Sequence, residues 1–192
     1  MQLAFSLATV FTLYFVMERL VLRADDGLPV VAITTLCGGT GIVIAALVAG
    51  FMASKSGRYA AFIVTAAVGL AAAAALRATA SGTAQLWVSA AIGGVALGVY
   101  YAVDLALALR AIPVGETGAY LGVFNIAETL PQTFAPALAL GVLAIVGENY
   151  TVLYLVAAAV ALLALVPLPF MRSILSRSAR AAADPSPQLI AR

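Results

Sequence analysis

Long apolar stretches are the feature that most constrains how this chain can fold. The hydrocarbon core of a bilayer is about 30 Å thick and a helix rises about 1.5 Å per residue, so a spanning helix needs about 20 apolar residues. Membrane β-strands are shorter, and their residues alternate between polar and apolar with a period of two. The apolar stretches of this chain are too long for such strands and do not alternate in this way. We therefore expect six transmembrane helices, over residues 1–22, 30–52, 60–76, 85–109, 119–146 and 150–171.

The composition excludes most soluble classes of protein. Hydrophobic residues make up 64% of the chain and charged residues 9%, whereas a soluble domain carries about a quarter charged residues. The chain has no histidine and a single cysteine, Cys37, which excludes a histidine-based metal site and an internal disulfide. A net charge of +2 without a dense basic patch gives no basis for nucleic-acid binding. We expect an all-α integral membrane protein with no cofactor, no metal and no enzymatic activity, because no catalytic constellation is present.

The distribution of Lys and Arg predicts the orientation in the membrane, because these residues are commonest on the cytoplasmic side. With a cytoplasmic N-terminus, the outer segments hold Arg19, Arg23 and Arg77. The inner segments then hold more cations, namely Lys55, Arg58, Arg110, Arg172, Arg177, Arg180 and Arg192. We expect both termini to be cytoplasmic, with residues 172–192 forming a polar, disordered tail. The alanine-rich, lysine-poor composition is typical of bacterial proteins and favours the inner membrane.

Asp104 lies within the fourth predicted span. A carboxylate near the middle of a membrane helix costs about 2.5–3.5 kcal/mol on insertion scales, so this side chain should face protein or water. Tyr100 and Tyr101 lie one turn earlier, where they can donate hydrogen bonds or stack on a sugar. We expect these residues to line a transport path, with protonation of Asp104 as a candidate coupling step. The alternative is an interfacial carboxylate that pairs with Arg110.

The fifth predicted span carries a stripe of polar residues. Asn125, Glu128 and Gln132 lie within about 60° of one helical face. This pattern favours the lining of a water-filled path, and the alternative is hydrogen bonding between helices. Pro131 and Pro136 each remove a backbone donor, which predicts a helix kink of the kind that a gating element needs.

Glycines at helical spacing predict close contacts between helices. The second span contains Gly38, Gly39 and Gly41, and G-x-x-x-G pairs occur at residues 94 and 98 and at residues 118 and 122. We interpret all of these glycines as packing positions.

Residues 50–59, with the sequence G-F-M-A-S-K-S-G-R-Y, resemble the loop signature of the major facilitator superfamily, G-x-L-A-D-R-x-G-R-R. The match includes Gly50, Lys55, Gly57 and Arg58, and Ser54 stands where the family has aspartate. We expect a short turn in which the glycines let two helices approach and reverse direction. Residues 98–136 are similar to the tenth and eleventh helices of sugar-type facilitators, in the sucrose and glycoside–cation symporter-like branch.

The resemblance implies the C-terminal half of a facilitator, in which two six-helix halves enclose a central path. It implies a secondary transporter in the lipid bilayer for a small polar solute, with a sugar as one candidate and proton symport as one mechanism. The missing half would be a second copy of this chain or a separately encoded N-terminal half. The alternative is a truncated or accessory membrane fragment without transport activity of its own.

Overall fold

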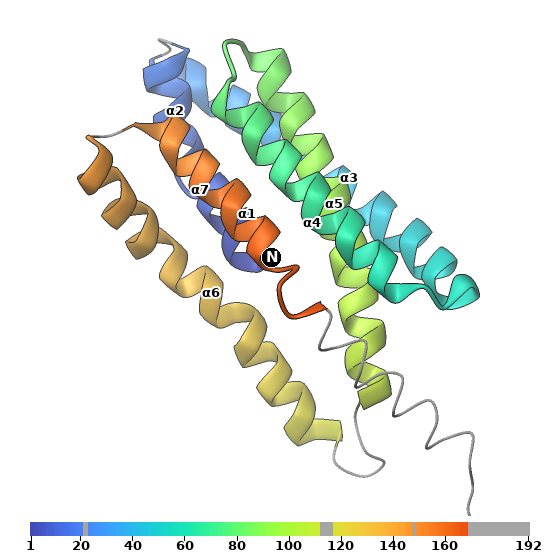
Figure 1. The fold of residues 1–192 in the computed structure, drawn as a ribbon. Helices are drawn as coiled ribbons and strands as arrows, with labels where there is room; N and C mark the ends of the chain where they lie inside the picture. The colour runs from blue at the N-terminus through green and yellow to red at the C-terminus, as the bar shows by residue number, and fades with distance from the viewer. Residues whose placement is uncertain (21–22, 112–116, 148, 169–192) are drawn as a thin grey trace, which may run out of the picture.

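The computed structural model describes residues 1–20, 23–111, 117–147 and 149–168, and this part of the chain is helical with no strand (Figure 1). The prediction of an all-α protein is confirmed. The helices of the described residues are α1 (Gln2–Thr9), α2 (Thr12–Arg19), α3 (Ala24–Ser56), α4 (Tyr59–Ala78), α5 (Thr83–Ala111), α6 (Thr117–Val146) and α7 (Tyr150–Leu163).

Four of these helices, α3 to α6, are long and apolar enough to cross a membrane. The first predicted span is not one helix, because the chain is interrupted at Val10 and Phe11 between α1 and α2. The sixth predicted span is shortened, since α7 ends at Leu163 and tight turns continue to Leu168. Pro167 has no N–H group to donate to the Leu163 carbonyl, which explains this end. The predicted tail, residues 172–192, lies outside the described residues.

Helix α3 is longer than the predicted span at both ends. It begins six residues earlier, at Ala24, because Asp25 and Asp26 in its first turn interact favourably with the positive end of the helix dipole. It ends at Ser56 because Gly57 adopts the left-handed conformation, with φ of 66°. Glycine reaches this conformation without steric cost, and it commonly ends helices.

Helices α3 and α5 pack with their backbones in contact. A Cβ atom at Gly94 would lie 2.8 Å from the carbonyl carbon of Gly38, and one at Gly98 would lie 3.0 Å from the carbonyl carbon of Ile42. Any side chain at these positions would hold the helices apart. The interpretation of Gly38, Gly94 and Gly98 as packing positions is therefore confirmed.

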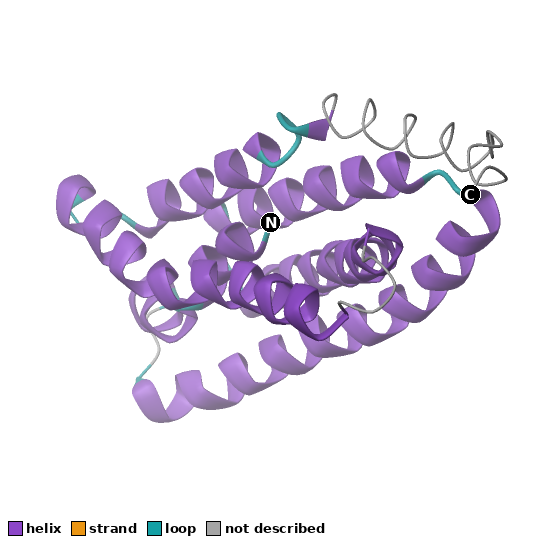
Figure 2. Ribbon diagram, turned by 90° about the horizontal axis from the view of Figure 1, so that it is seen from below, coloured by secondary structure: helices purple, strands orange, loops and turns teal. Residues whose placement is uncertain are grey.

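Helix α6 is placed differently. It contacts α1 and α7, on the side of the bundle away from α3 (Figures 1 and 2). A Cβ atom at Gly118 or Gly122 on α6 would have no neighbour within 4 Å in the other helices that the structure describes. The predicted packing role of this second G-x-x-x-G pair is therefore wrong within the described residues, where no other helix covers these two glycines.

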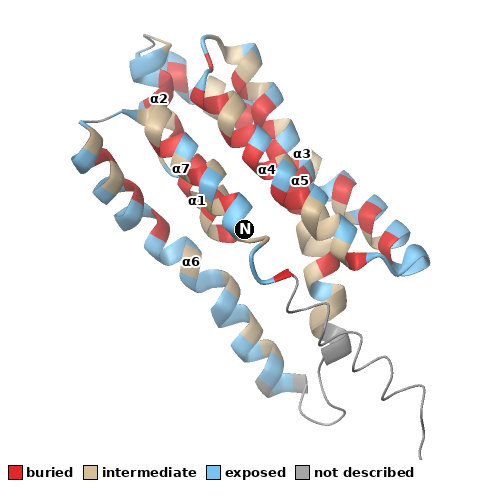
Figure 3. Ribbon diagram, viewed as in Figure 1, coloured by how far each residue is buried: buried red, intermediate tan, exposed pale blue. Residues whose placement is uncertain are grey.

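Many large apolar side chains of the bundle are exposed, and Figure 3 shows how exposed residues are distributed along the helices. Phe51 on α3 is 71% exposed and Ile145 on α6 is 87% exposed. Large apolar side chains exposed over long helices are typical of surfaces that face lipid. Together with the length of α3 to α6, this indicates a multi-pass membrane protein.

Candidate functional site

The structure brings together two carboxyl groups that lie on separate helices. Asp104 on α5 and Glu128 on α6 are close enough for their side chains to interact directly. The Tyr100 hydroxyl, one turn before Asp104, interacts with the same carboxyl group. The predicted alternative partner of Asp104, the Arg110 side chain, lies outside the described part of the molecule. The result is a polar cluster of Tyr100, Asp104 and Glu128 between two apolar helices.

Tyr101 points to a different partner from that of Tyr100. The Gln2 amide donates a hydrogen bond of 2.8 Å to the Tyr101 hydroxyl, and the hydroxyl donates one of 3.1 Å to the Gln2 carbonyl oxygen. Gln2 is 5% exposed, so this pair joins the start of α1 to the middle of α5 within the bundle. Gln2 is not among the predicted site residues, although a lone amide in an apolar segment is a signal for such a bond.

The remaining polar residues of α6 are on the surface of this chain. Asn125 and Gln132 are exposed, whereas Glu128 is half-buried. Neither Asn125 nor Gln132 has a side-chain hydrogen bond within the described residues. They therefore do not join the helices of this chain to one another, and their role in a path stays a prediction. Pro131 and Pro136 lie within α6, which continues unbroken past both (Figure 1).

The loop that resembles the family signature is shorter than predicted. Gly50 lies inside α3, where its role as a turn residue is wrong, and its Cβ position makes only an ordinary 3.9 Å contact with Ala102. Gly57 forms the turn, as expected, and Arg58 immediately precedes α4. Lys55 lies in the last turn of α3, where a cation interacts favourably with the negative end of the helix dipole.

Arg77 is the main residue that the sequence analysis misplaced. The prediction assigned it to an outer segment, but α4 continues to Ala78 and Arg77 is only 4% exposed. Its Nη1 donates hydrogen bonds to the Ala8 carbonyl and to the Thr12 hydroxyl, the latter at 3.4 Å. Its Nε donates to the Ser89 hydroxyl at 3.4 Å. Arg77 therefore lies inside the bundle of described helices rather than on its surface.

The interruption between α1 and α2 explains why Arg77 is held inside the bundle. A break in a helix leaves carbonyl groups without their usual N–H partners, and such groups are tolerated at membrane depth only where other groups bond them. The Ala8 carbonyl accepts from Arg77, and the Thr9 carbonyl accepts from the Thr12 hydroxyl at 2.7 Å. The guanidinium also lies 5.8 Å from the centre of the Tyr154 ring, within range of a cation–π interaction.

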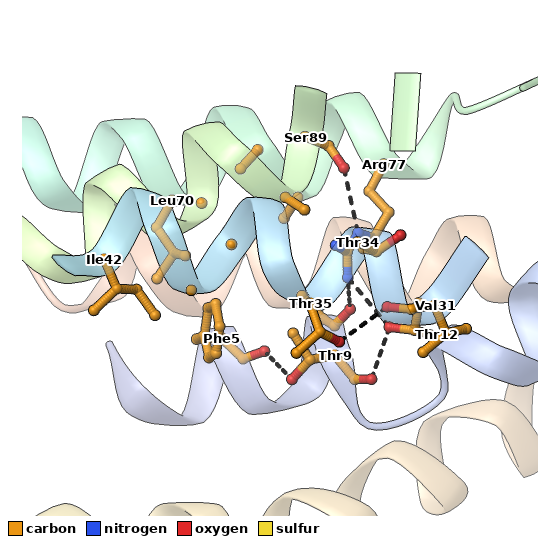
Figure 4. A pocket seen from close by; sticks show the side chains of 17 residues that line it. Phe5, Thr9, Thr12, Val31, Thr34, Thr35, Ile42, Leu70, Arg77 and Ser89 are labelled. Atoms are coloured by element: carbon orange, nitrogen blue, oxygen red, sulfur yellow. Dashed lines mark hydrogen bonds between the residues drawn. The ribbon is translucent and has the colours of Figure 1, made fainter. Parts of the chain in front are cut away.

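A cavity of about 370 Å³ lies beside Arg77, between α1, α2, α3, α4 and α5 (Figure 4). Its volume is within the range of small-molecule sites, about 300–1,000 Å³. Thr35 and Gly39 on α3 are exposed and line it, so the cavity is open to the outside of this chain. Its lining combines apolar side chains with hydroxyl groups and the one guanidinium, including Phe5, Thr9, Thr12, Thr34, Thr35, Ile42, Leu70, Arg77 and Ser89.

No group of three metal-ligating side chains comes together among the described residues. The two candidate functional features are therefore the carboxyl cluster of Asp104 and Glu128 and the cavity beside Arg77. The spacing of residues along α5 and α6 suggested the carboxyl cluster. Nothing in the spacing suggested the cavity, because an arginine at the end of an apolar stretch is typical of a membrane interface.

Comparison with known proteins supports an origin in one family. The profile of the Major Facilitator Superfamily matches residues 3–189, which is nearly the whole chain. Neither the curated proteins nor the solved structures contain a match. The match agrees with the resemblance of residues 50–59 to the superfamily's loop signature. It identifies the superfamily and not the sugar symporter branch within it. The chain belongs to the Major Facilitator Superfamily of membrane transporters.

Proposed function

We propose that this protein is a secondary transporter that moves a small polar solute by alternating access between the two sides of the membrane. The observation that carries the proposal is the open cavity beside an interrupted helix in a chain of this superfamily. Transporters commonly bind their substrates at discontinuous helices, where backbone groups and polar side chains are available at membrane depth. In this proposal α1 with α2 forms the first of six membrane crossings, and α7 with the turns after it forms the sixth.

The carboxyl cluster supports a role in coupling. Two neighbouring carboxylates repel each other, and a proton shared between them relieves this repulsion. Asp104 and Glu128 would therefore carry a proton in symport with the solute, and the Tyr100 hydroxyl would orient Asp104. Because Asp104 and Glu128 lie on different helices, a change in protonation would alter the force between α5 and α6.

The exposed residues of α6 support a second six-span unit. Asn125 and Gln132 are polar and exposed, and no other described helix comes within 4 Å of a Cβ position at Gly118 or Gly122. A second unit, either another copy of this chain or a separate N-terminal half, would supply the opposite wall of the path and cover these residues. Both termini would lie in the cytoplasm, at the inner membrane of a bacterium. A sugar is the candidate solute from the resemblance.

The first test is native mass spectrometry of the purified chain in nanodiscs. A dimer, or a complex with a second membrane chain, is the expected result. The second test reconstitutes that assembly in liposomes that contain a pH-sensitive dye and adds sugars, sugar acids and amino acids in turn. We expect one solute class to drive proton uptake. A monodisperse monomer with no proton or solute uptake would instead support the accessory-fragment alternative.

Variants test the coupling residues directly. We expect Asp104→Asn and Glu128→Gln each to abolish proton-coupled uptake while the amount of protein in the membrane stays unchanged. The matched control is Glu18→Gln, which removes an exposed carboxylate of α2 outside the cluster and should leave uptake intact. Full uptake by both cluster variants would remove the proposed roles of these two residues.

A further inference from the structure

We propose that the cavity beside Arg77 binds a small monocarboxylate that carries hydroxyl groups, with the carboxylate held by the guanidinium. Only one part of this inference rests on the proposed transport function, namely that the bound anion is also the solute that is transported. The binding site itself is argued from the cavity.

The charge of Arg77 is the first argument. No acidic side chain among the described residues forms an ion pair with it. Removing a cation from water is expensive, by several kcal/mol for each ion even after relaxation. The Ala8 carbonyl, two hydroxyl groups and the face of Tyr154 compensate part of this cost. A bound anion would supply the missing opposite charge.

The geometry of the guanidinium is the second argument. Its hydrogen bonds use Nε and Nη1, and Nη2 has no hydrogen-bond partner in the part of the chain that the structure describes. The two N–H groups of Nη2 are therefore free to donate charge-assisted hydrogen bonds to an oxygen of a carboxylate or a phosphate. A phosphate group carries about two negative charges at pH 7, which would leave an unbalanced negative charge beside this single cation. A carboxylate, with one charge, balances it.

The hydroxyl groups of the cavity indicate what the rest of the ligand carries. Thr9, Thr34 and Thr35 donate their hydrogens to backbone carbonyls of their own helices, at 3.0, 2.7 and 3.0 Å. A hydroxyl group has one hydrogen to donate and two lone pairs. These three threonines therefore present acceptors to the cavity, and they suit a ligand with hydroxyl donors. Phe5, Ile42 and Leu70 would contact its carbon atoms (Figure 4).

The test measures equilibrium binding to the full chain in nanodiscs, so it does not require transport. The probes are glycerate, its neutral amide glyceramide, propionate, which has the carboxylate but no hydroxyl group, and inorganic phosphate. We expect glycerate to bind about ten- to a hundredfold more tightly than glyceramide, because a charged hydrogen bond is lost in the amide. Propionate and phosphate should each bind more weakly than glycerate.

A steric variant locates the site without changing Arg77. Gly39 lines the cavity, and none of the other helices in the described part of the chain comes within 4 Å of its Cβ position. Gly39→Leu should therefore fold normally, fill the cavity and abolish glycerate binding. The matched control is Gly141→Leu on α6, where the Cβ position is equally free and binding should be unchanged. Arg77→Lys keeps the charge but lacks the Nη2 donors, and it should weaken glycerate binding about tenfold.

The outcomes separate this inference from the proposed function. Equal binding of glycerate and glyceramide would overturn an anion site, and tighter binding of phosphate than of glycerate would overturn the choice of a carboxylate. Equal binding of propionate and glycerate would overturn the role of the hydroxyl groups. Sugar uptake without glycerate binding would overturn the inference and leave the transporter intact. Selective glycerate binding that Gly39→Leu abolishes, in liposomes that show no uptake, would support the site and count against transport.

Discussion

The contact between α3 and α5 leads to a sharp prediction about two similar glycine pairs. Both pairs have G-x-x-x-G spacing, yet only the pair at Gly94 and Gly98 is in backbone contact with another helix. We predict that Gly94→Ala destabilises the protein and that Gly122→Ala does not. The substitution adds the same methyl group to a helix in each case, so the comparison isolates the effect of packing.

The magnitude follows from the distances at Gly94. A Cβ atom there would lie 2.8 Å from the Gly38 carbonyl carbon, whereas two carbon atoms attract each other best at about 3.5–4.0 Å. The Gly38 carbonyl oxygen lies closer still, so the helices must separate locally by at least about 0.7 Å. A gap of that size already removes about a quarter to a half of the attraction across it. Overpacking costs about 1–3 kcal/mol, and the upper end applies because the obstacle is backbone. Replacing a helical glycine by alanine stabilises the helix itself by about 1 kcal/mol, which offsets part of this cost.

We expect Gly94→Ala to lower the free energy of unfolding by about 2 kcal/mol. For Gly122→Ala, whose added methyl group meets no other described helix within 4 Å, we expect a rise of up to about 1 kcal/mol. Titration with SDS in mixed micelles, followed by circular dichroism, measures both values on the same preparation. Equal changes for the two variants would refute the reasoning, because the structure assigns contact to only one of the two glycines.

Three further predictions use the same unfolding assay. Gly57→Ala should lower the free energy of unfolding by about 1–2 kcal/mol, because its φ of 66° is unfavourable for a residue with a Cβ atom. Gly82→Ala, with a free Cβ position, should show no such decrease. Tyr101→Phe should lower the free energy of unfolding by about 1–3 kcal/mol, because it leaves the buried Gln2 amide without its partner. The double variant with Gln2→Leu should recover part of this free energy. No recovery would contradict the hydrogen bond between Gln2 and Tyr101. Thr12→Val should lower the free energy of unfolding by about 1–3 kcal/mol, because it removes both the bond that caps the Thr9 carbonyl and an acceptor of the buried Arg77 guanidinium. An unchanged stability would contradict the assignment of these two bonds.

Much of the helical architecture could be predicted from the sequence. The positions of α4, α5 and α6 were predicted to within about two residues, because the apolar stretches there are bounded by charges, glycines and polar residues. The interruption at Val10 and Phe11 could not be predicted. The Ala8 carbonyl beside it is bonded by Arg77, 69 residues away, and no local pattern in an apolar stretch reveals a tertiary bond of that kind.

The candidate site was predicted only in part, for a related reason. Helical spacing assigns Tyr100 and Asp104 to one turn of a helix, but it gives no information on which residues of another helix lie opposite. The interaction of Asp104 with Glu128 therefore required the structure. Arg77 was assigned to the membrane interface because cations near the ends of apolar stretches usually lie there. Its burial depends on carbonyl groups that the interruption of the first span exposes.

The length of α3 has a consequence for how the protein sits in a bilayer. Its 33 residues extend about 50 Å, whereas the hydrocarbon core is about 30 Å thick and the bilayer with its headgroups about 40–45 Å. Asp25 and Asp26 mark one end of this helix and Lys55 the other, so both ends favour the headgroup regions or the water beyond them. A thinner bilayer must then increase the tilt of α3. Because α5 is in backbone contact with α3, the two helices would tilt together, and the angle of this pair would vary with the lipid chain length of the host membrane.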